Sequence, residues 1–298
     1  MKLRTLRADL LLLLTAAVWG FAFVAQRIGM EHVGPFIFNG IRFALGCLVL
    51  VPFAWVRRHR AGAAGGRGSL VVGLAAGGVL FLGASLQQIG IVYTTAGKAG
   101  FITGLYVVLV PLLATIWCHR VGRGAWIGAL LAAVGLYLLS VREGFRISLG
   151  DALVLASAFC WATHVLIIAR WSKRHDVILL ALIQFATCSV LSLGVAFLTE
   201  SFTVQAIRAA GIPILYGGLL SVGLGYTLQV VAQRDAPPTT AAILLSLEAV
   251  FAVLGGWLIL NETLVPRAMV GCGLMLAGVV LSQIGPEPAE DRVATRVT

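Results

Sequence analysis

The sequence predicts an all-α integral membrane protein, with ten transmembrane helices arranged as two inverted five-helix repeats. Three observations lead to this fold class. Hydrophobic residues make up 59% of the 298 residues and charged residues only 11%, whereas soluble domains contain about 45–50% and about 25% of these classes. Long apolar runs recur along the whole chain, and the second half repeats the residue pattern of the first. This composition argues strongly against a water-soluble fold.

The apolar runs are the candidate transmembrane helices. A segment in contact with lipid must bond all of its backbone N–H and C=O groups internally, so each run of about 20 apolar residues is expected to be a helix. Short breaks containing Gly, Pro or Arg separate the runs. The ten predicted spans are residues 9–28, 34–56, 70–92, 98–118, 125–141, 150–170, 177–199, 210–233, 238–260 and 264–284.

The two ends of the chain carry different signals. Lys2, Arg4 and Arg7 precede the first apolar run, as in a signal peptide, but no small-residue cleavage site follows it. We therefore expect a retained first helix. Residues 286–298 are polar and are expected to form a disordered cytoplasmic tail.

The excess of basic residues indicates the orientation in the membrane. The formal net charge is +10, but the Lys and Arg residues lie mostly in the breaks between spans. The expected partner is therefore the lipid bilayer and not a nucleic acid. With the N-terminus inside, 15 basic residues fall on the inner side and 6 on the outer side. Because cytoplasmic loops are enriched in Lys and Arg, we expect both termini in the cytoplasm and a multi-pass protein of the cell inner membrane.

An internal repeat divides the chain into residues 1–145 and 146–285. At an offset of 142, Trp19 matches Trp161 and Gln87 matches Gln229. Each copy contains five spans, and an odd number makes the second copy enter the membrane from the opposite side. Inverted repeats are typical of transporters that work by alternating access around a site near the midplane. The alternative is a duplication that only enlarged a helix bundle.

Short motifs along the chain resemble a known family. They are Trp19-Gly20, Arg42-Phe43, the segment 93–101 (YTTAGKAGF), Leu247-Glu248-Ala249-Val250 and Asn261-Glu262. In order and spacing they resemble the EamA family of the drug/metabolite transporter superfamily, over essentially the whole chain. Two departures are Glu248-Ala249-Val250, where the family often has Glu-Pro-Val, and His119-Arg120, where it often has Gly-Glu. The resemblance implies transport of amino acids, other metabolites or drug-like amines, often outward.

Polar residues inside the predicted spans are the candidate site. An ionisable group inside a span costs about 2.5–3.5 kcal/mol on insertion scales, so such groups are expected to face a cavity or a partner. Glu248 is the candidate proton-coupling residue, because low dielectric favours the neutral carboxyl and suits uptake and release of a proton. The alternative is a structural Glu bonded to a carbonyl. The predicted substrate-binding residues are Trp19, Gln87, Lys98, Tyr106, Trp161, Gln229 and Glu248.

Several of these candidates have plainer interpretations. Arg42 and its repeat partner Gln184 are expected to be structural or gating residues, although Arg42 could equally contact substrate. Lys98 could bind a substrate carboxylate at a helix start or extend to the lipid interface. The tryptophans could serve core packing, and the glutamines could bond neighbouring helices. His164 is expected to be a packed histidine.

The predicted function is secondary active transport of a small organic molecule, with export favoured. The sequence contains no HExxH, P-loop or nucleophile-elbow motif, and its five cysteines show no metal-ligand spacing. We therefore expect no metal, no cofactor and no enzymatic activity. Proton-coupled transport and a facilitative uniporter or channel-like permease both remain open. A monomer and a homodimer are both compatible with the sequence.

Overall fold

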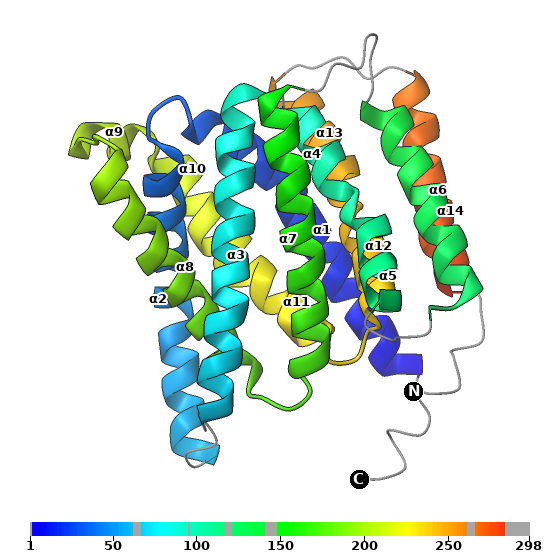
Figure 1. Ribbon diagram of the computed structural model, residues 1–298, viewed down its shortest axis with the longest axis horizontal. Helices are drawn as coiled ribbons and strands as arrows, with labels where there is room; N and C mark the ends of the chain where they lie inside the picture. The colour runs from blue at the N-terminus through cyan, green and yellow to red at the C-terminus, as the bar shows by residue number, and fades with distance from the viewer. Residues whose placement is uncertain are drawn as a thin grey trace.

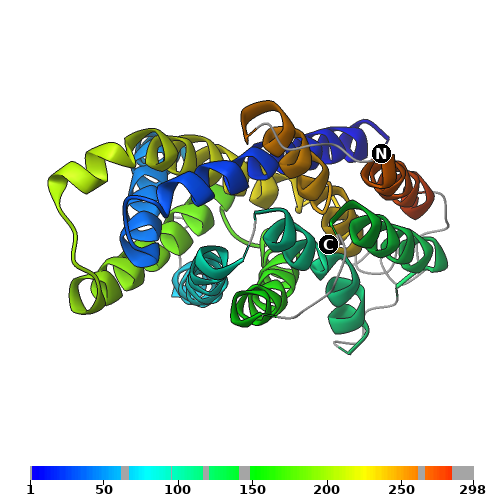
Figure 2. The ribbon, with the colours of Figure 1, turned by 90° about the horizontal axis from the view of Figure 1, so that it is seen from above.

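A computed structural model describes residues 2–61, 67–94, 96–116, 121–140, 148–260 and 266–283. Within these ranges the chain is helical throughout and contains no strand, and the helices lie side by side in one bundle (Figures 1 and 2). The predicted tail, residues 286–298, lies outside the described residues. Eight helices are long and apolar enough to cross a membrane, and two shorter apolar helices cover 123–138 and 269–282.

Three of the first five predicted spans are single, uninterrupted helices. They are α1 (Lys2–Gly29), α2 (Pro35–Ala61) and α3 (Arg67–Tyr93), which are 28, 27 and 27 residues long. The fifth span is the shorter α6 (Arg123–Ser140). The fourth predicted span, 98–118, was wrongly expected to be one helix. It consists of α4 (Ala96–Gly104) and α5 (Tyr106–Ile116), which are separated by a turn at Leu105.

The second half begins with α7 (Leu149–Trp171) and α8 (Val177–Thr199), as predicted. The short α9 (Val204–Ala209) follows, a helix that the sequence did not predict. The ninth span divides into α12 (Pro238–Leu245) and α13 (Glu248–Leu260), where one helix over 238–260 was expected. The tenth is α14 (Pro266–Gln283).

The breaks in the fourth and ninth spans show the same backbone hydrogen-bond pattern. The backbone N–H groups of Leu105 and Leu247 each bond a carbonyl three residues earlier, as in a 3₁₀ turn. The Ser246 hydroxyl also donates to the Ile243 carbonyl at 2.8 Å and so competes with the helical backbone bonds. Leu105 and Leu247 are 142 residues apart, so the two spans break at equivalent places.

The eighth predicted span, 210–233, is also not one α-helix. It runs as α10 (Gly211–Leu215), the π-helix η1 (Tyr216–Tyr226) and α11 (Thr227–Ala232). Four of the eleven residues in η1 are glycines, at positions Gly217, Gly218, Gly223 and Gly225. Glycines offer no side-chain resistance to a wider turn. π segments occur frequently at functional sites.

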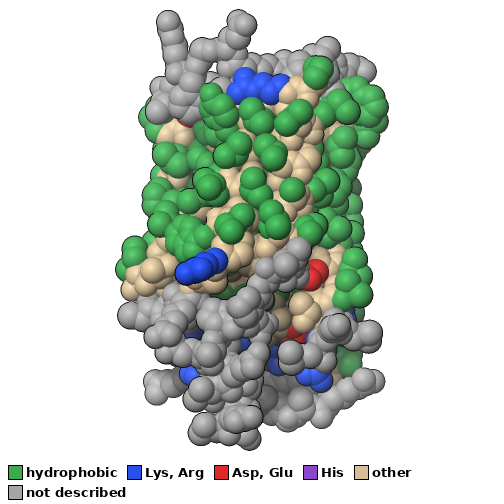
Figure 3. Space-filling view, turned by 90° about the vertical axis from the view of Figure 1, so that its right-hand side faces the viewer, with side chains coloured by type: hydrophobic (Ala, Val, Ile, Leu, Met, Phe, Trp, Pro, Cys, Tyr) green, Lys and Arg blue, Asp and Glu red, His purple; other side chains and the backbone are tan. Residues whose placement is uncertain are grey.

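The two halves of the chain pack against each other, and helices of one half contact helices of the other. Helix α1 packs against η1, α11, α12 and α13, and helix α7 packs against α3, α4 and α5. Helices α2 and α8 pack against each other, and α6 packs against α14 at one end of the bundle (Figure 1). Figure 3 shows the outer face at this end, where hydrophobic side chains cover the middle. Leu130 and Met269 there are 65% and 68% exposed, as expected of a lipid-facing surface.

Candidate functional site

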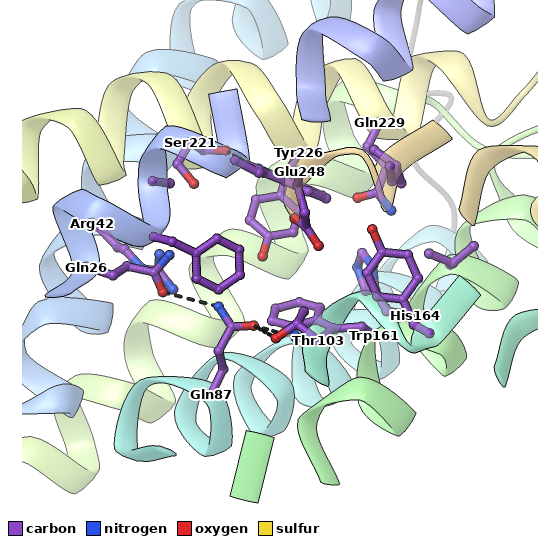
Figure 4. Close-up of a pocket in the computed structure, with 16 residues that line it drawn as sticks. Gln26, Arg42, Gln87, Thr103, Trp161, His164, Ser221, Tyr226, Gln229 and Glu248 are labelled. Atoms are coloured by element: carbon purple, nitrogen blue, oxygen red, sulfur yellow. Dashed lines mark hydrogen bonds between the residues drawn. The ribbon is translucent and has the colours of Figure 1, made fainter. Parts of the chain in front are cut away.

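A cavity lies at the centre of the bundle, where helices of the two halves meet (Figure 4). It offers about 40 Å³ to the centres of water-sized molecules, which is room for on the order of three waters. Both broken spans and the π-helix reach it. The lining residues are Trp19, Ala22, Phe23, Gln26, Arg42, Gln87, Thr103, Tyr106, Trp161, His164, Val165, Ser221, Tyr226, Gln229, Leu245 and Glu248.

The structure brings together most of the residues singled out from the sequence. Six of the seven predicted substrate-binding residues line this one cavity: Trp19, Gln87, Tyr106, Trp161, Gln229 and Glu248. The backbone of Lys98 belongs to α4, but its side chain lies outside the described residues. Arg42 also lines the cavity, whereas Gln184 does not. The Gln184 Oε1 atom instead lies 2.8 Å from Nε2 of His164.

Gln87 on α3 is the centre of a buried hydrogen-bond network. Its Nε2 donates to Oε1 of Gln26 at 3.2 Å, and its Oε1 accepts from the indole of Trp161 at 2.8 Å. The Thr103 hydroxyl also donates to the same oxygen, at 3.5 Å. Figure 4 shows these bonds joining α1, α3, α4 and α7 along one side of the cavity. Because both amide atoms are occupied, this side is held in place.

The two tryptophans pack against glycines of the opposite half. Trp19 on α1 donates its indole N–H to the Ser221 carbonyl of η1 at 3.1 Å. A Cβ on Gly225 would lie 2.6 Å from Trp19 Nε1, so any residue larger than glycine would clash with the indole in this position. A Cβ on Gly83 would lie 3.4 Å from the ring of Trp161, a normal contact distance. The arrangement on the side of Trp19 is therefore the tighter of the two.

Glu248 is the acidic group of the cavity. It is the first residue of α13, where the helix dipole favours a negative charge, and it is only 4% exposed. Its Oε1 atom has no hydrogen-bond partner among the described residues, and the Tyr106 side chain lies beside the carboxyl group. The two side chains interact electrostatically, and each begins the second helix of a broken span. A buried carboxyl with an unpartnered oxygen can accept a proton or a cationic ligand.

Arg42 is the basic group of the cavity and is 2% exposed. Its guanidinium lies 5.5 Å from the ring centre of Phe38 and 5.1 Å from that of Phe43, both on its own helix. Its Nε has no hydrogen-bond partner among the described residues. The cavity thus combines one cation, one carboxyl and neutral hydrogen-bonding groups. No described group of three His, Cys, Asp or Glu side chains could hold a metal ion.

Sequence reasoning missed several lining residues. Tyr226 lies 4.6 Å from Trp19 and 6.2 Å from Trp161 between ring centres, so it joins the two tryptophans. Gln26 and Thr103 complete the network around Gln87. The available signal was their polarity inside apolar runs, but none of the three has a polar partner at the repeat offset. His164, expected to be only a packed histidine, lines the cavity as well.

Comparisons with known proteins agree with this architecture. An uncharacterised transporter of Archaeoglobus fulgidus is 34% identical over 93% of this chain and 86% of its own length. The threonine/homoserine exporter RhtA of Escherichia coli K12 is 26% identical over 90% of this chain and 88% of its own. A probable amino-acid metabolite efflux pump of Salmonella typhimurium is 26% identical over 92% of this chain and 94% of its own length.

A solved crystal structure has the same fold, with a TM-score of 0.78 at 17% identity, over 93% of this chain and 96% of the other. The model of the EamA-like transporter family matches twice, at residues 6–141 and 148–283. Together these two matches span nearly all of the sequence. The chain therefore belongs to the EamA-like transporter family.

Proposed function

We propose that this protein is a secondary active exporter that moves a small amino acid or amine metabolite across the inner membrane by alternating access. The substrate occupies the central cavity, and Glu248 exchanges it for a proton. The observation that carries the proposal is a buried carboxyl with an unpartnered oxygen in a central, largely neutral cavity between the two halves. The cavity is small, so substrate entry requires the helices around it to move.

The distribution of lining residues supports an inverted repeat around this site. Twelve of the sixteen lining residues form six pairs that are 142 positions apart. The pairs are Trp19 with Trp161, Ala22 with His164, Phe23 with Val165, Gln87 with Gln229, Thr103 with Leu245, and Tyr106 with Glu248. The helix contacts follow the same pattern. Helix α7 of the second half packs on α3 of the first half, and helix α1 of the first half packs on η1 and α11 of the second half.

The broken spans support a site at mid-membrane. In secondary transporters, discontinuous helices place helix ends at substrate and ion sites near the midplane. Here Tyr106 and Glu248 stand at the two breaks and both line the cavity. We count the eight long apolar helices and the two shorter ones, α6 and α14, as ten spans. The excess of basic residues on the side of the N-terminus then supports a cytoplasmic location for both termini.

The relatives support the direction and the substrate class. One is named a threonine/homoserine exporter and another a probable amino-acid metabolite efflux pump. Both match about nine-tenths of this chain. We therefore assign outward transport, with a small amino acid as the first compound to test.

The test uses the full chain in proteoliposomes with radiolabelled L-threonine. We expect saturable counterflow in the absence of a pH gradient, and faster uptake when the gradient drives proton exchange. Glu248→Gln keeps the size of the side chain but cannot exchange a proton, so gradient-driven flux falls to background while the protein still inserts. Asp235→Asn, an acid-to-amide change at an exposed turn, is the matched control and keeps wild-type flux.

Each outcome separates the candidate mechanisms. Gradient-driven flux that is unchanged in Glu248→Gln removes the role of Glu248 in coupling. Saturable counterflow with no response to the gradient in the wild-type protein indicates a facilitative uniporter. Flux that does not saturate indicates a channel, and a wild-type protein without flux of any amino acid or amine contradicts the proposal as a whole.

A further inference from the structure

We propose that Arg42 binds the carboxylate of a zwitterionic substrate whose ammonium group binds Glu248. This inference rests on the proposed function and names the chemical class of its substrate, an α-amino acid with both charged groups free. It gives Arg42 a direct binding role, one of the two roles that the sequence left open, the other being a structural or gating one.

The first step is that Arg42 carries a charge that the described protein does not neutralise. A guanidinium stays protonated in proteins. Arg42 is 2% exposed, and the groups that act on it electrostatically are Tyr226 and Cys188, neither of which is a carboxylate. The rings of Phe38 and Phe43 offer only cation–π contact. A buried cation without a counter-charge is costly, so its position in a cavity wall favours an anionic ligand.

The second step is that the guanidinium is available to a ligand. Arg42 lines the cavity, and its Nε atom has no hydrogen-bond partner among the described residues. A Cβ on Gly217 of η1 would lie 3.2 Å from Cδ of Arg42, so a glycine there leaves room for the arginine stem. A planar guanidinium matches the two oxygens of a carboxylate, and the Nε–H of Arg42 is free to donate to one of them.

The third step is that the carboxyl and the guanidinium are separate but share a neighbour. Tyr226 interacts electrostatically with both Arg42 and Glu248. Figure 4 shows Arg42 on one side of the cavity and Glu248 near its middle, beside Tyr226. The groups therefore suit the two ends of one small zwitterion.

The charges balance over one binding event. In the empty cavity Arg42 is cationic and Glu248 is a neutral acid. When the zwitterion binds, its carboxylate pairs with Arg42, and its ammonium group pairs with the Glu248 carboxylate after one proton leaves Glu248. The net charge of the cavity falls from one positive charge to zero on binding, and the released proton carries the difference. Substrate binding and proton release then become one exchange, which is the coupling that the proposed function requires.

The experiment compares acid and amide ligands in the full-length protein in proteoliposomes. L-threonine and L-threonine amide compete for counterflow of radiolabelled L-threonine. The wild-type protein is expected to prefer the acid by about 10–100-fold, the value of one hydrogen-bonded charge pair. Arg42→Gln should lose most of this preference, mainly through weaker binding of L-threonine. Arg42→Lys keeps a charge without the planar fork and should retain an intermediate preference.

Arg208→Gln on the exposed α9 removes an arginine far from the cavity and serves as the matched control. Wild-type protein that binds the acid and the amide equally overturns the role of Arg42 whether or not the variants fold. Threonine counterflow in Arg42→Gln with the full wild-type preference for the acid overturns it as well, and leaves the proposed transport function standing. Absence of counterflow of any amino acid in the wild-type protein overturns both.

Discussion

Gln87 and Gln229 occupy equivalent positions in the two halves, but their surroundings differ. Both amide atoms of Gln87 are bonded, to Gln26 and Trp161 among others. The Oε1 atom of Gln229, by contrast, has no partner among the described residues. The comparison indicates that the part of the first half around Gln87 forms a fixed wall of the cavity. The equivalent position in the second half leaves a hydrogen-bond acceptor free to bind a ligand.

The helices that carry these glutamines also differ in regularity, and the helix of the second half is the less regular one. Gln87 lies on α3, an uninterrupted 27-residue α-helix, whereas Gln229 lies on α11, directly after the π-helix η1. The wider π turn carries Ser221 and Tyr226 into the cavity. Both halves share the equivalent helix breaks at Leu105 and Leu247, whereas among the described residues the π-helix occurs only in the second half.

The largest effect on stability is expected from Gln87→Leu. The change removes three hydrogen bonds and leaves the Trp161 N–H and the Gln26 carbonyl oxygen unpartnered, at about 1–3 kcal/mol for each buried group. We expect a loss of about 2–5 kcal/mol in unfolding free energy, measured by denaturation of the purified protein in detergent. Gln229→Leu should cost less than about 1 kcal/mol, because its Oε1 is already unpartnered. Equal losses in the two variants would contradict a fixed first-half wall.

A smaller effect is expected at the glycines that face the two tryptophans. In Gly225→Ala the new methyl group would lie 2.6 Å from Trp19 Nε1, so the indole must move and its bond to Ser221 is lost. We expect a destabilisation of about 1–3 kcal/mol, as for other overpacked sites. Gly83→Ala meets its neighbours at 3.1 Å or more, and is expected to change stability by less than about 1 kcal/mol. Thermal unfolding of both variants tests the difference, and a larger loss in Gly83→Ala would refute it.

The sequence correctly predicted an all-helical chain with long apolar helices, because hydrophobicity and helix length are local properties. It also predicted that Trp19, Trp161 and Glu248 line the cavity, since polar or bulky groups inside apolar runs tend to face a cavity or a polar partner. The helix breaks at Leu105 and Ser246 were missed, because they depend on backbone bonds that apolar residues do not reveal. The unpaired guanidinium of Arg42 could not be predicted either, since burial without a counter-charge is a property of the packed bundle.

The smallest effect is expected at Gln184, the repeat partner of Arg42. Its Oε1 lies 2.8 Å from His164 Nε2, so Gln184→Leu removes a single neutral hydrogen bond, worth about 0.5–1.5 kcal/mol. Because His164 lines the cavity, water can replace the lost partner. Counterflow of L-threonine should therefore stay within about twofold of the wild-type rate, while Arg42→Gln loses acid selectivity. A loss of selectivity in Gln184→Leu as large as that in Arg42→Gln would mean that the two positions act alike, and that divergence between the halves does not locate the substrate's carboxylate.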